Sequence, residues 1–404
     1  MDNQAAIRYS ALAAFPGDAM PDYIQDLPKW VKIIRSMKEI IITNIVLTGQ
    51  VPAPTYHEQD RANLFMERLS EFQIDECTTD DYNNPIGIIR GTSHSKPPIF
   101  VVAHMDTAFG KDIDHNFTIK TDTIRGTGLL DNSLGVGVLA SLPAILRKLK
   151  LQFESDIVLC GALQSIGKGN LRGIRHLLKT WSTPIRGAIC LESGELGRLN
   201  YYSDGMIRCE IRCIVDRSIQ RSQRFLPNAI LVLNEVINQI LELRLPLKPR
   251  SKVIFGKING GLKHGEIALT ATLGIEIRSD SDEMVGSLYN DIRDIVRGLG
   301  HEFEVDLKTK TISNVRASRL KYNHPLVKTA AAVMTALGLH PMSGPSESEL
   351  SIFLSRNVPA LTLGITHGQG YQEKEAIMQI NPMFDGIAQV IGIMRAIDAG
   401  VCDE

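Results

Sequence analysis

Short apolar runs that alternate with helical patterns constrain the fold of this chain most strongly. Three short runs, at 99–103, 156–160 and 187–191, are apolar apart from Asp156 at the start of the second. Continuous runs of this length are typical of strands covered on both faces. The segments between them, 134–149 and 171–179, space their apolar residues as helices do. This alternation predicts an α/β fold with a mainly parallel sheet sandwiched by helices.

A different pattern interrupts this alternation in the second half of the chain. Apolar and polar residues alternate along strands with helices between them, in the order 207–215, 227–243, 252–258, 269–277, 284–299 and 303–307. The order β-α-β-β-α-β predicts a ferredoxin-like unit whose antiparallel sheet is covered on one face only. The α/β pattern resumes with 324–337, 359–364 and 381–399. We therefore expect a discontinuous domain, 1–205 with 313–404, and an inserted domain, 206–312.

The overall charge excludes two classes of partner. The chain has 44 Lys and Arg against 45 Asp and Glu, a net charge of −1, so it offers no global field for nucleic acid or an anionic membrane. The mean hydropathy of −0.02, together with the lack of an apolar run near 18 residues, predicts no transmembrane helix.

Two further features bear on the compartment. The chain begins without the basic and apolar regions of a secretory signal. The six cysteines form no C-x-x-C pair. Cys209 and Cys213 share one face of a strand, which indicates buried free thiols. These features predict a reducing cytoplasm.

Polar side chains follow the buried runs at their carboxyl ends, where open α/β sheets bind ligands. His104 and Asp106 follow the first run, and alternation places them on one side of the extended chain. Asp131 precedes a glycine-rich helix, and Glu192 follows the third run. One imidazole with carboxylates suits zinc or a similar divalent ion. Asp106 could fix the tautomer of His104.

Each position also has an ordinary structural explanation. Polar residues at a strand end can simply be solvated, and a lone acid such as Glu192 is usually a loop residue. Asp131 could be a helix N-cap. Composition and spacing leave both interpretations open.

Five motifs follow one another along the chain: His104-x-Asp106, Gly128 to Asp131-Asn132, Leu171-Arg172-Gly173, Glu192, and Gly260-Gly261 with Arg278-Ser279. In this order they resemble the zinc-dependent exopeptidase and aminoacylase family of peptidase T, carboxypeptidase G and succinyl-diaminopimelate desuccinylase. The resemblance runs from about Val51 to the C-terminus, and the insert is similar to that family's lid and dimerisation domain. It implies a peptide- or amino-acid-like substrate and a homodimer formed through the insert.

In that family two metal ions share a bridging carboxylate, and the first residue of a Glu-Glu pair activates the bridging water. The resemblance implies that His104, Asp131 and Glu192 hold one ion, with Asp131 as the bridge. It implies that Asp106 supports His104, and that Arg278 recognises the substrate carboxylate.

The other half of that site departs from the family pattern. Ser165 and Ile166, or Gln164 and Ser165, stand where the Glu-Glu pair is expected. None of these side chains can take a proton from water near neutral pH. Tyr371 stands where the family has a C-terminal His, and His367 lies four residues earlier. The sequence therefore predicts one ion at most, with His367 and Tyr371 as possible extra ligands.

The insert also departs from the family. That family's lid has a His before its first helix, but the stretch 216–221 contains none. His264, in the Gly-Gly loop, is the nearest histidine of the insert, at a different position.

Three hypotheses follow. The first is an impaired or inactive homologue that binds peptides or N-acyl amino acids, because loss of the base alone should slow hydrolysis by about 10²–10⁴-fold. The second is an active one-metal amide hydrolase with a rebuilt site. The third is a non-catalytic dimeric subunit of an assembly. A nucleotide-binding enzyme is excluded, since no glycine-rich fingerprint follows the first strand.

Candidates for the rebuilt site of the second hypothesis are His367, Glu347, Glu349 and Glu373. Glu349 is also a candidate substrate contact.

Overall fold

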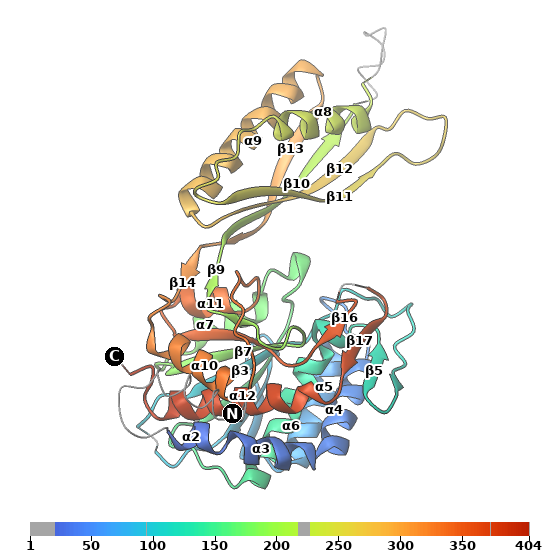
Figure 1. The fold of residues 1–404 in the computed structure, drawn as a ribbon. Coiled ribbons are helices and arrows are strands. Elements are labelled where there is room, and N and C mark those ends of the chain that lie inside the picture. Colours follow the sequence, from blue (N-terminus) through green and yellow to red (C-terminus); the bar gives the residue numbers. More distant parts are fainter. Residues whose placement is uncertain (1–20, 94, 217–226, 372, 404) are drawn as a thin grey trace. The chain divides into compact units, whose positions relative to one another are not determined.

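The computed structural model describes residues 21–93, 95–216, 227–371 and 373–403. Its contacts divide the chain into two compact units, which Figure 1 shows with their elements labelled. The main unit comprises Met1–Tyr202 and Arg319–Glu404, and the insert unit comprises Ser203–Ser318. The chain thus leaves the main unit once and returns to it.

A seven-stranded sheet forms the centre of the main unit, in the order β1-β2-β6-β3-β7-β15-β8. The four strands β6, β3, β7 and β15 run parallel, and the strands beside them pair antiparallel. The predicted mainly parallel sheet is therefore confirmed. The strands are β1 Glu76–Thr79, β2 Pro85–Ile89, β3 Ile99–His104, β6 Ile157–Ala162, β7 Gly187–Glu192, β8 Leu199–Asn200 and β15 Ala360–Gly364.

Helices cover both faces of this sheet because its strands are apolar on both sides. Along β3, Val101 and Ala103 belong to the hydrophobic cluster under α3, α4, α5, α6, α10 and α12. Phe100 and Val102 belong to a second cluster, under α7 and α11. The helices are α2 Asp22–Gln25, α3 Leu27–Arg35, α4 Lys38–Gln50, α5 Gln59–Glu71, α6 Leu134–Leu149, α7 Arg172–Thr180, α10 Pro325–Ala336, α11 Leu350–Ser355 and α12 Pro382–Asp398.

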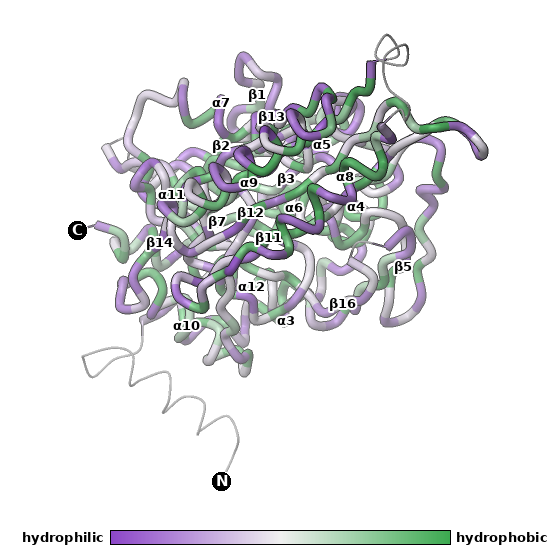
Figure 2. Tube along the Cα trace, turned by 90° about the horizontal axis from the view of Figure 1, so that it is seen from above, coloured by the Kyte–Doolittle hydropathy of each residue, from purple (hydrophilic) through white to green (hydrophobic). Residues whose placement is uncertain are grey.

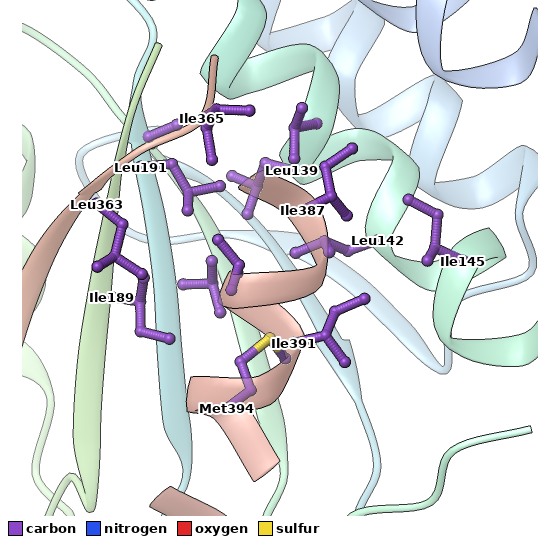
Figure 3. Packing of buried hydrophobic residues seen from close by; sticks show 14 of the residues in the cluster. Leu139, Leu142, Ile145, Ile189, Leu191, Leu363, Ile365, Ile387, Ile391 and Met394 are labelled. Atoms are coloured by element: carbon purple, nitrogen blue, oxygen red, sulfur yellow. The ribbon is translucent and has the colours of Figure 1, made fainter. Parts of the chain in front are cut away.

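Figure 3 shows the packing on the first face. Leu191 of β7 and Leu363 of β15 project from the sheet toward α12, whereas Ile387 of α12 lies on the side of α6, which carries Leu139. All four side chains are buried. Branched aliphatic residues from two strands and two helices thus interdigitate, which is how a sheet and its covering helices exclude water.

One helical segment corrects the expectation that no stretch is long and apolar enough to cross a membrane. Leu129–Leu149 meets that criterion by length and composition, and 89% of its apolar window is buried inside the fold. The core helix of a globular domain has the same properties, because α6 is apolar where it contacts the sheet and its neighbouring helices.

A second correction concerns the first helical segment. The spacing from Trp30 to Ile41 predicts one continuous helix, but α3 ends at Arg35 and α4 begins at Lys38. Ser36 is the C-cap of α3: its N–H donates to the carbonyls of Lys32 and Ile33, and its hydroxyl donates a further local hydrogen bond to the Ile33 carbonyl.

A small antiparallel sheet was not predicted. Its order is β16-β17-β5-β4, and it joins segments that lie about 250 residues apart in the chain. The strands have two to four residues each, too few to show a period. They are β4 Thr118–Ile119, β5 Thr123–Gly126, β16 Gly368–Gln369 and β17 Ala376–Gln379.

The insert unit has the predicted element order, with sheet order β11-β12-β10-β13. Cys209, Ile211 and Cys213 of β10 are buried under α8 and α9, whereas Arg212 is exposed. In Figure 2, hydrophilic and hydrophobic segments alternate along α9, as expected for a helix with one face on a sheet. The elements are β10 Gly205–Ile214, α8 Ala229–Leu241, β11 Ser251–Gly260, β12 Thr270–Ser279, α9 Asp282–Glu302 and β13 Asp306–Val315. A separate short pair of strands, β9 Tyr202–Ser203 and β14 Ser318–Arg319, lies where the chain passes between the two units.

The cysteines are all free thiols. Cys209 and Cys213 are buried on one face, as predicted, and burial raises the pKa of these thiols to about 12 and about 11. Cys77 and Cys402 are half-buried.

Replacing a core residue tests the packing in Figure 3. Leu139→Ala should lower the free energy of unfolding by about 2–5 kcal/mol, because it leaves a cavity between helix and sheet. Ile119→Ala removes a side chain that is 52% exposed and should change stability by less than about 0.5 kcal/mol. Urea denaturation measures both, and equal effects would contradict this assignment of the core.

Candidate functional site

The carboxyl ends of the central strands bring the predicted polar residues into one region. β3 lies between β6 and β7, and His104 pairs in register with Ala162 of β6. Glu192 is the last residue of β7. Because parallel strands end at the same edge of the sheet, residues that lie far apart in the chain become neighbours.

His104 lies between two carboxylates. Its Nδ1 is 3.0 Å from the backbone oxygen of Asp106 and 3.4 Å from Oδ1 of the same residue. Its Nε2 is 3.1 Å from Oδ1 of Asp131. Burial disfavours the charged imidazole, but the hydrogen bonds to Asp106 and Asp131 outweigh burial and hold its pKa well above the ordinary value.

Asp131 lies in a turn that its neighbour holds against β7. The amide of Asn132 donates to the Leu191 carbonyl at 2.9 Å, and Ser193 donates to the Asn132 side-chain oxygen at 2.5 Å. The peptide bond between Asp131 and Asn132 is cis. Asn132 thus anchors the turn and leaves the side chain of Asp131 35% exposed.

Glu192 completes the set that the resemblance implies for one ion. Burial raises the pKa of its carboxyl to about 7, and the nearby charge of Asp131 raises it as well. The charge of His104 acts in the opposite direction. Within the described ranges, however, no three His, Cys, Asp or Glu side chains are grouped closely enough to hold a metal ion.

Three consecutive residues occupy the expected place of the Glu-Glu pair, and each is bound to a different buried carboxylate. The backbone N–H of Gln164 donates to Glu58 at 2.9 Å, and the backbone N–H of Ile166 donates to Asp106 at 2.8 Å. The hydroxyl of Ser165 donates to Oε1 of Glu349 at 2.5 Å. All three carboxylates belong to buried residues. The segment is therefore fixed in place, and none of its side chains is a metal ligand of the expected kind.

Tyr371, in the expected place of the C-terminal His, packs against the segment that follows β7. A Cβ added to Gly194 would lie 1.6 Å from the Tyr371 ring, so the ring rests on the bare glycine backbone. The Tyr371 hydroxyl accepts a hydrogen bond from the N–H of Glu195 at 2.7 Å. Burial raises the pKa of this phenol. The side chain of His367 is exposed, and its backbone oxygen accepts from Gln379.

The remaining predicted residues have other surroundings. Arg278, in the insert unit, forms an ion pair with Glu276, which also pairs with Arg208. Glu349 is only 2% exposed, so the surface available to a substrate is small. His264, Glu347 and Glu373 are exposed. Of the stretch 216–221, all residues except Asp216 lie outside the described residues.

Three residues around Asp106 were missed from the sequence. Thr55 donates to Oδ2 of Asp106 at 2.8 Å. Arg61 is buried and donates to the carbonyls of Val51 and Met105. Burial raises the pKa of Glu58 and lowers that of Arg61 to about 10. No spacing rule marks these residues, because Thr55 and Glu58 precede α5, Arg61 lies in it, and only the tertiary fold brings them near Asp106.

Replacing Arg61 tests whether its buried side chain stabilises the segments around Asp106. Arg61→Met should lower the free energy of unfolding by about 2–5 kcal/mol, because it leaves two buried carbonyls without a donor. The control Arg297→Met removes a side chain that is 63% exposed and should change stability by less than about 0.5 kcal/mol. Thermal or urea unfolding of both variants checks this, and an Arg61→Met chain as stable as wild type would contradict it.

The sequence matches no protein-family model and no curated protein. Solved structures do match. The di-peptidase Dug1p from Saccharomyces cerevisiae is similar with a TM-score of 0.76 at 12% identity, over 93% of this chain and 99% of that chain. A tripeptidase from Staphylococcus aureus has a TM-score of 0.70 at 15% identity, over 90% and 99%.

A third solved structure carries the family name. The YXEP protein of Bacillus subtilis, described as a dinuclear metal binding peptidase from the M20 family, has a TM-score of 0.58 at 12% identity, over 88% of this chain and 99% of that chain. At such identities the likeness shows the fold. The resemblance predicted from the motifs is confirmed at that level: this chain has the fold of the M20 peptidases, the zinc-dependent exopeptidase and aminoacylase family.

Proposed function

We propose that the protein binds peptides or N-acyl amino acids at the carboxyl ends of β3, β6 and β7, and that it has lost the two-metal hydrolysis associated with its fold. The fold supports the ligand class, since similar structures belong to a di-peptidase and a tripeptidase. The polar residues His104, Asp131 and Glu192 at those strand ends would contact the ligand.

The anchoring of Gln164, Ser165 and Ile166 carries the proposal of lost hydrolysis. A water-activating base must be a group that can take a proton near neutral pH and that reaches the attacking water. Here the segment offers a backbone N–H, a hydroxyl and a second backbone N–H, each directed at a buried carboxylate. A second ion would also lack its imidazole ligand, because Tyr371 stands in the place of that His. The Tyr371 hydroxyl already accepts a hydrogen bond from the backbone N–H of Glu195.

The residues present do not fit a pair of metal ions. Of the ligands that the resemblance assigns to two ions, only His104, Asp131 and Glu192 are present, which is the set for one ion. We therefore propose that at most one zinc or similar divalent ion binds. An active one-metal hydrolase with a rebuilt site has less support, because the candidate groups His367, Glu347 and Glu373 are exposed side chains.

We also propose that the protein works in a reducing cytoplasm. The six free cysteines support a reducing cytoplasm, since thiols persist there without forming disulfides.

Metal content and hydrolysis test the loss of the two-metal site. After incubation with excess zinc and dialysis, elemental analysis should find no more than one ion per chain. A panel of dipeptides and N-acyl amino acids should be hydrolysed, if at all, without dependence on zinc, because the base that activates a metal-bound water is missing. Two ions per chain, or zinc-dependent hydrolysis that His104→Ala abolishes, would contradict the proposal.

Ligand binding is tested separately by calorimetry with the same panel. Asp131→Ala should weaken binding by about ten- to hundredfold, the usual effect of losing a charge-assisted hydrogen bond. The control Asp294→Ala removes an exposed carboxylate of the insert unit and should leave the affinity unchanged. Failure of every peptide and N-acyl amino acid to bind wild-type protein would sink the ligand assignment.

We further propose that the protein is a homodimer formed through the insert unit. β11 is an edge strand of its sheet, and such an edge can pair with another chain. Exposed apolar residues at the start of α8, on β11 and in the loop that follows it make up what we term the edge patch: Ile230, Leu231, Ile258, Leu262 and Ile267, all at least 40% exposed. A Cβ added to Gly260 would lie 2.9 Å from Ile230, which places the start of α8 against the end of β11.

Sedimentation velocity tests the dimer. The wild-type chain should sediment at roughly twice its mass of 44.6 kDa, because burying an exposed apolar patch stabilises association. Leu231→Glu should shift it to the monomer. Leu247→Glu, which alters an exposed Leu of the same unit outside the edge patch, should not. A monomeric wild-type protein at micromolar concentration would contradict the proposal.

A further inference from the structure

Ser165 and Glu349 form a pair that the proposed binding function does not use. The Ser165 Oγ donates to Glu349 Oε1 at 2.5 Å. Glu349 is 2% exposed, whereas Ser165 is half-buried at the carboxyl end of β6. The carboxylate is thus shielded from water, whereas the residue whose hydroxyl donates to it is more exposed. A nucleophile paired with a shielded base has this arrangement.

The turn that carries Ser165 is rigid. It connects β6 to α7, and Gln164 adopts a positive φ of 52°. A Cβ added to Gly169 would lie 2.4 Å from the Gln164 carbonyl, so the turn closes tightly on itself. The residues on both sides of Ser165 are held by Glu58 and Asp106. The hydroxyl is therefore held in one position before any ligand binds, which lowers the entropic part of a reaction barrier.

Glu349 is held equally firmly. It precedes α11, and its backbone oxygen accepts from the N–H groups of Ile352 and Phe353 at 3.0 and 3.3 Å. Within the described part of the chain, Ser165 is the only side chain that donates a hydrogen bond to the Glu349 carboxylate. A buried carboxylate with a single donor keeps lone pairs free to accept a proton.

We propose that Ser165 is a nucleophile and Glu349 its general base, and that the site transfers acyl groups from amides or esters without a metal ion. This activity goes beyond ligand binding. The Ser165 oxygen forms a bond to the substrate carbonyl carbon, and its proton passes to Glu349. As the bond from that carbon to the amine or alcohol breaks, Glu349 gives the proton to the leaving group. Water then attacks the acyl-serine, releases the acid and restores the hydroxyl.

Covalent labelling tests the proposal in the full-length protein. A fluorophosphonate probe, added in the presence of EDTA, should form one adduct per chain, and peptide mass spectrometry should place it on Ser165. Its oxygen bonds to phosphorus, fluoride leaves, and Glu349 takes the proton. Ser165→Ala should give no adduct. Glu349→Gln keeps the shape and a hydrogen-bond acceptor but should slow labelling by about 10²–10⁴-fold, the usual contribution of a general base.

Ser355→Ala is the matched control. Ser355 lies at the end of α11, and its hydroxyl donates to the Ile352 carbonyl and not to Glu349. It should label at the wild-type rate. No adduct on a cooperatively folded wild-type chain, an adduct on another residue, or a Glu349→Gln chain that labels as fast as wild type would each overturn the proposal. Because EDTA is present, these outcomes are independent of zinc content and peptide affinity.

Discussion

The buried carboxylate of Asp106 is the interaction on which the candidate site depends. Its Oδ2 accepts from Thr55 and from the backbone of Ile166, and its Oδ1 lies beside His104. Burial alone would raise the pKa of this carboxyl, but the hydrogen bond from His104 and the further donors lower it. One side chain thus connects the loop before α5, the end of β3 and the segment after β6. Loss of its charge would weaken the contacts that Asp106 makes with all three.

The same physical rule applies to the other acids of the site. A buried carboxylate must be compensated by hydrogen bonds, by an opposite charge or by a metal ion. Glu58 is compensated by the backbone of Gln164, and Glu349 by the hydroxyl of Ser165. In a two-metal peptidase, ions supply much of this compensation. In this chain the segment 164–166 supplies hydrogen bonds to three buried acids, and these bonds hold the segment in place.

Much of the architecture could be predicted because its elements are long and periodic. The order β-α-β-β-α-β of the insert and the parallel strands around β3 follow from apolar spacing that spans whole elements. The boundary between α3 and α4 could not be read in this way, because the apolar residues keep their helical spacing across it and the local hydrogen bonds of Ser36 lie outside that pattern. The small sheet of β4, β5, β16 and β17 was also missed, since two-residue strands paired across the chain carry no local signal.

The amino-acid sequence by itself determined which chemical groups are available: His104, Asp131 and Glu192 are present, and no Glu-Glu pair precedes Gly167. Only the tertiary structure decided what the substituted residues do. Ser165 meets Glu349, which lies 184 residues later, and Tyr371 rests on Gly194. The physical reason is that a side chain's reactivity depends on its hydrogen-bond partners and burial, and packing between distant segments sets both.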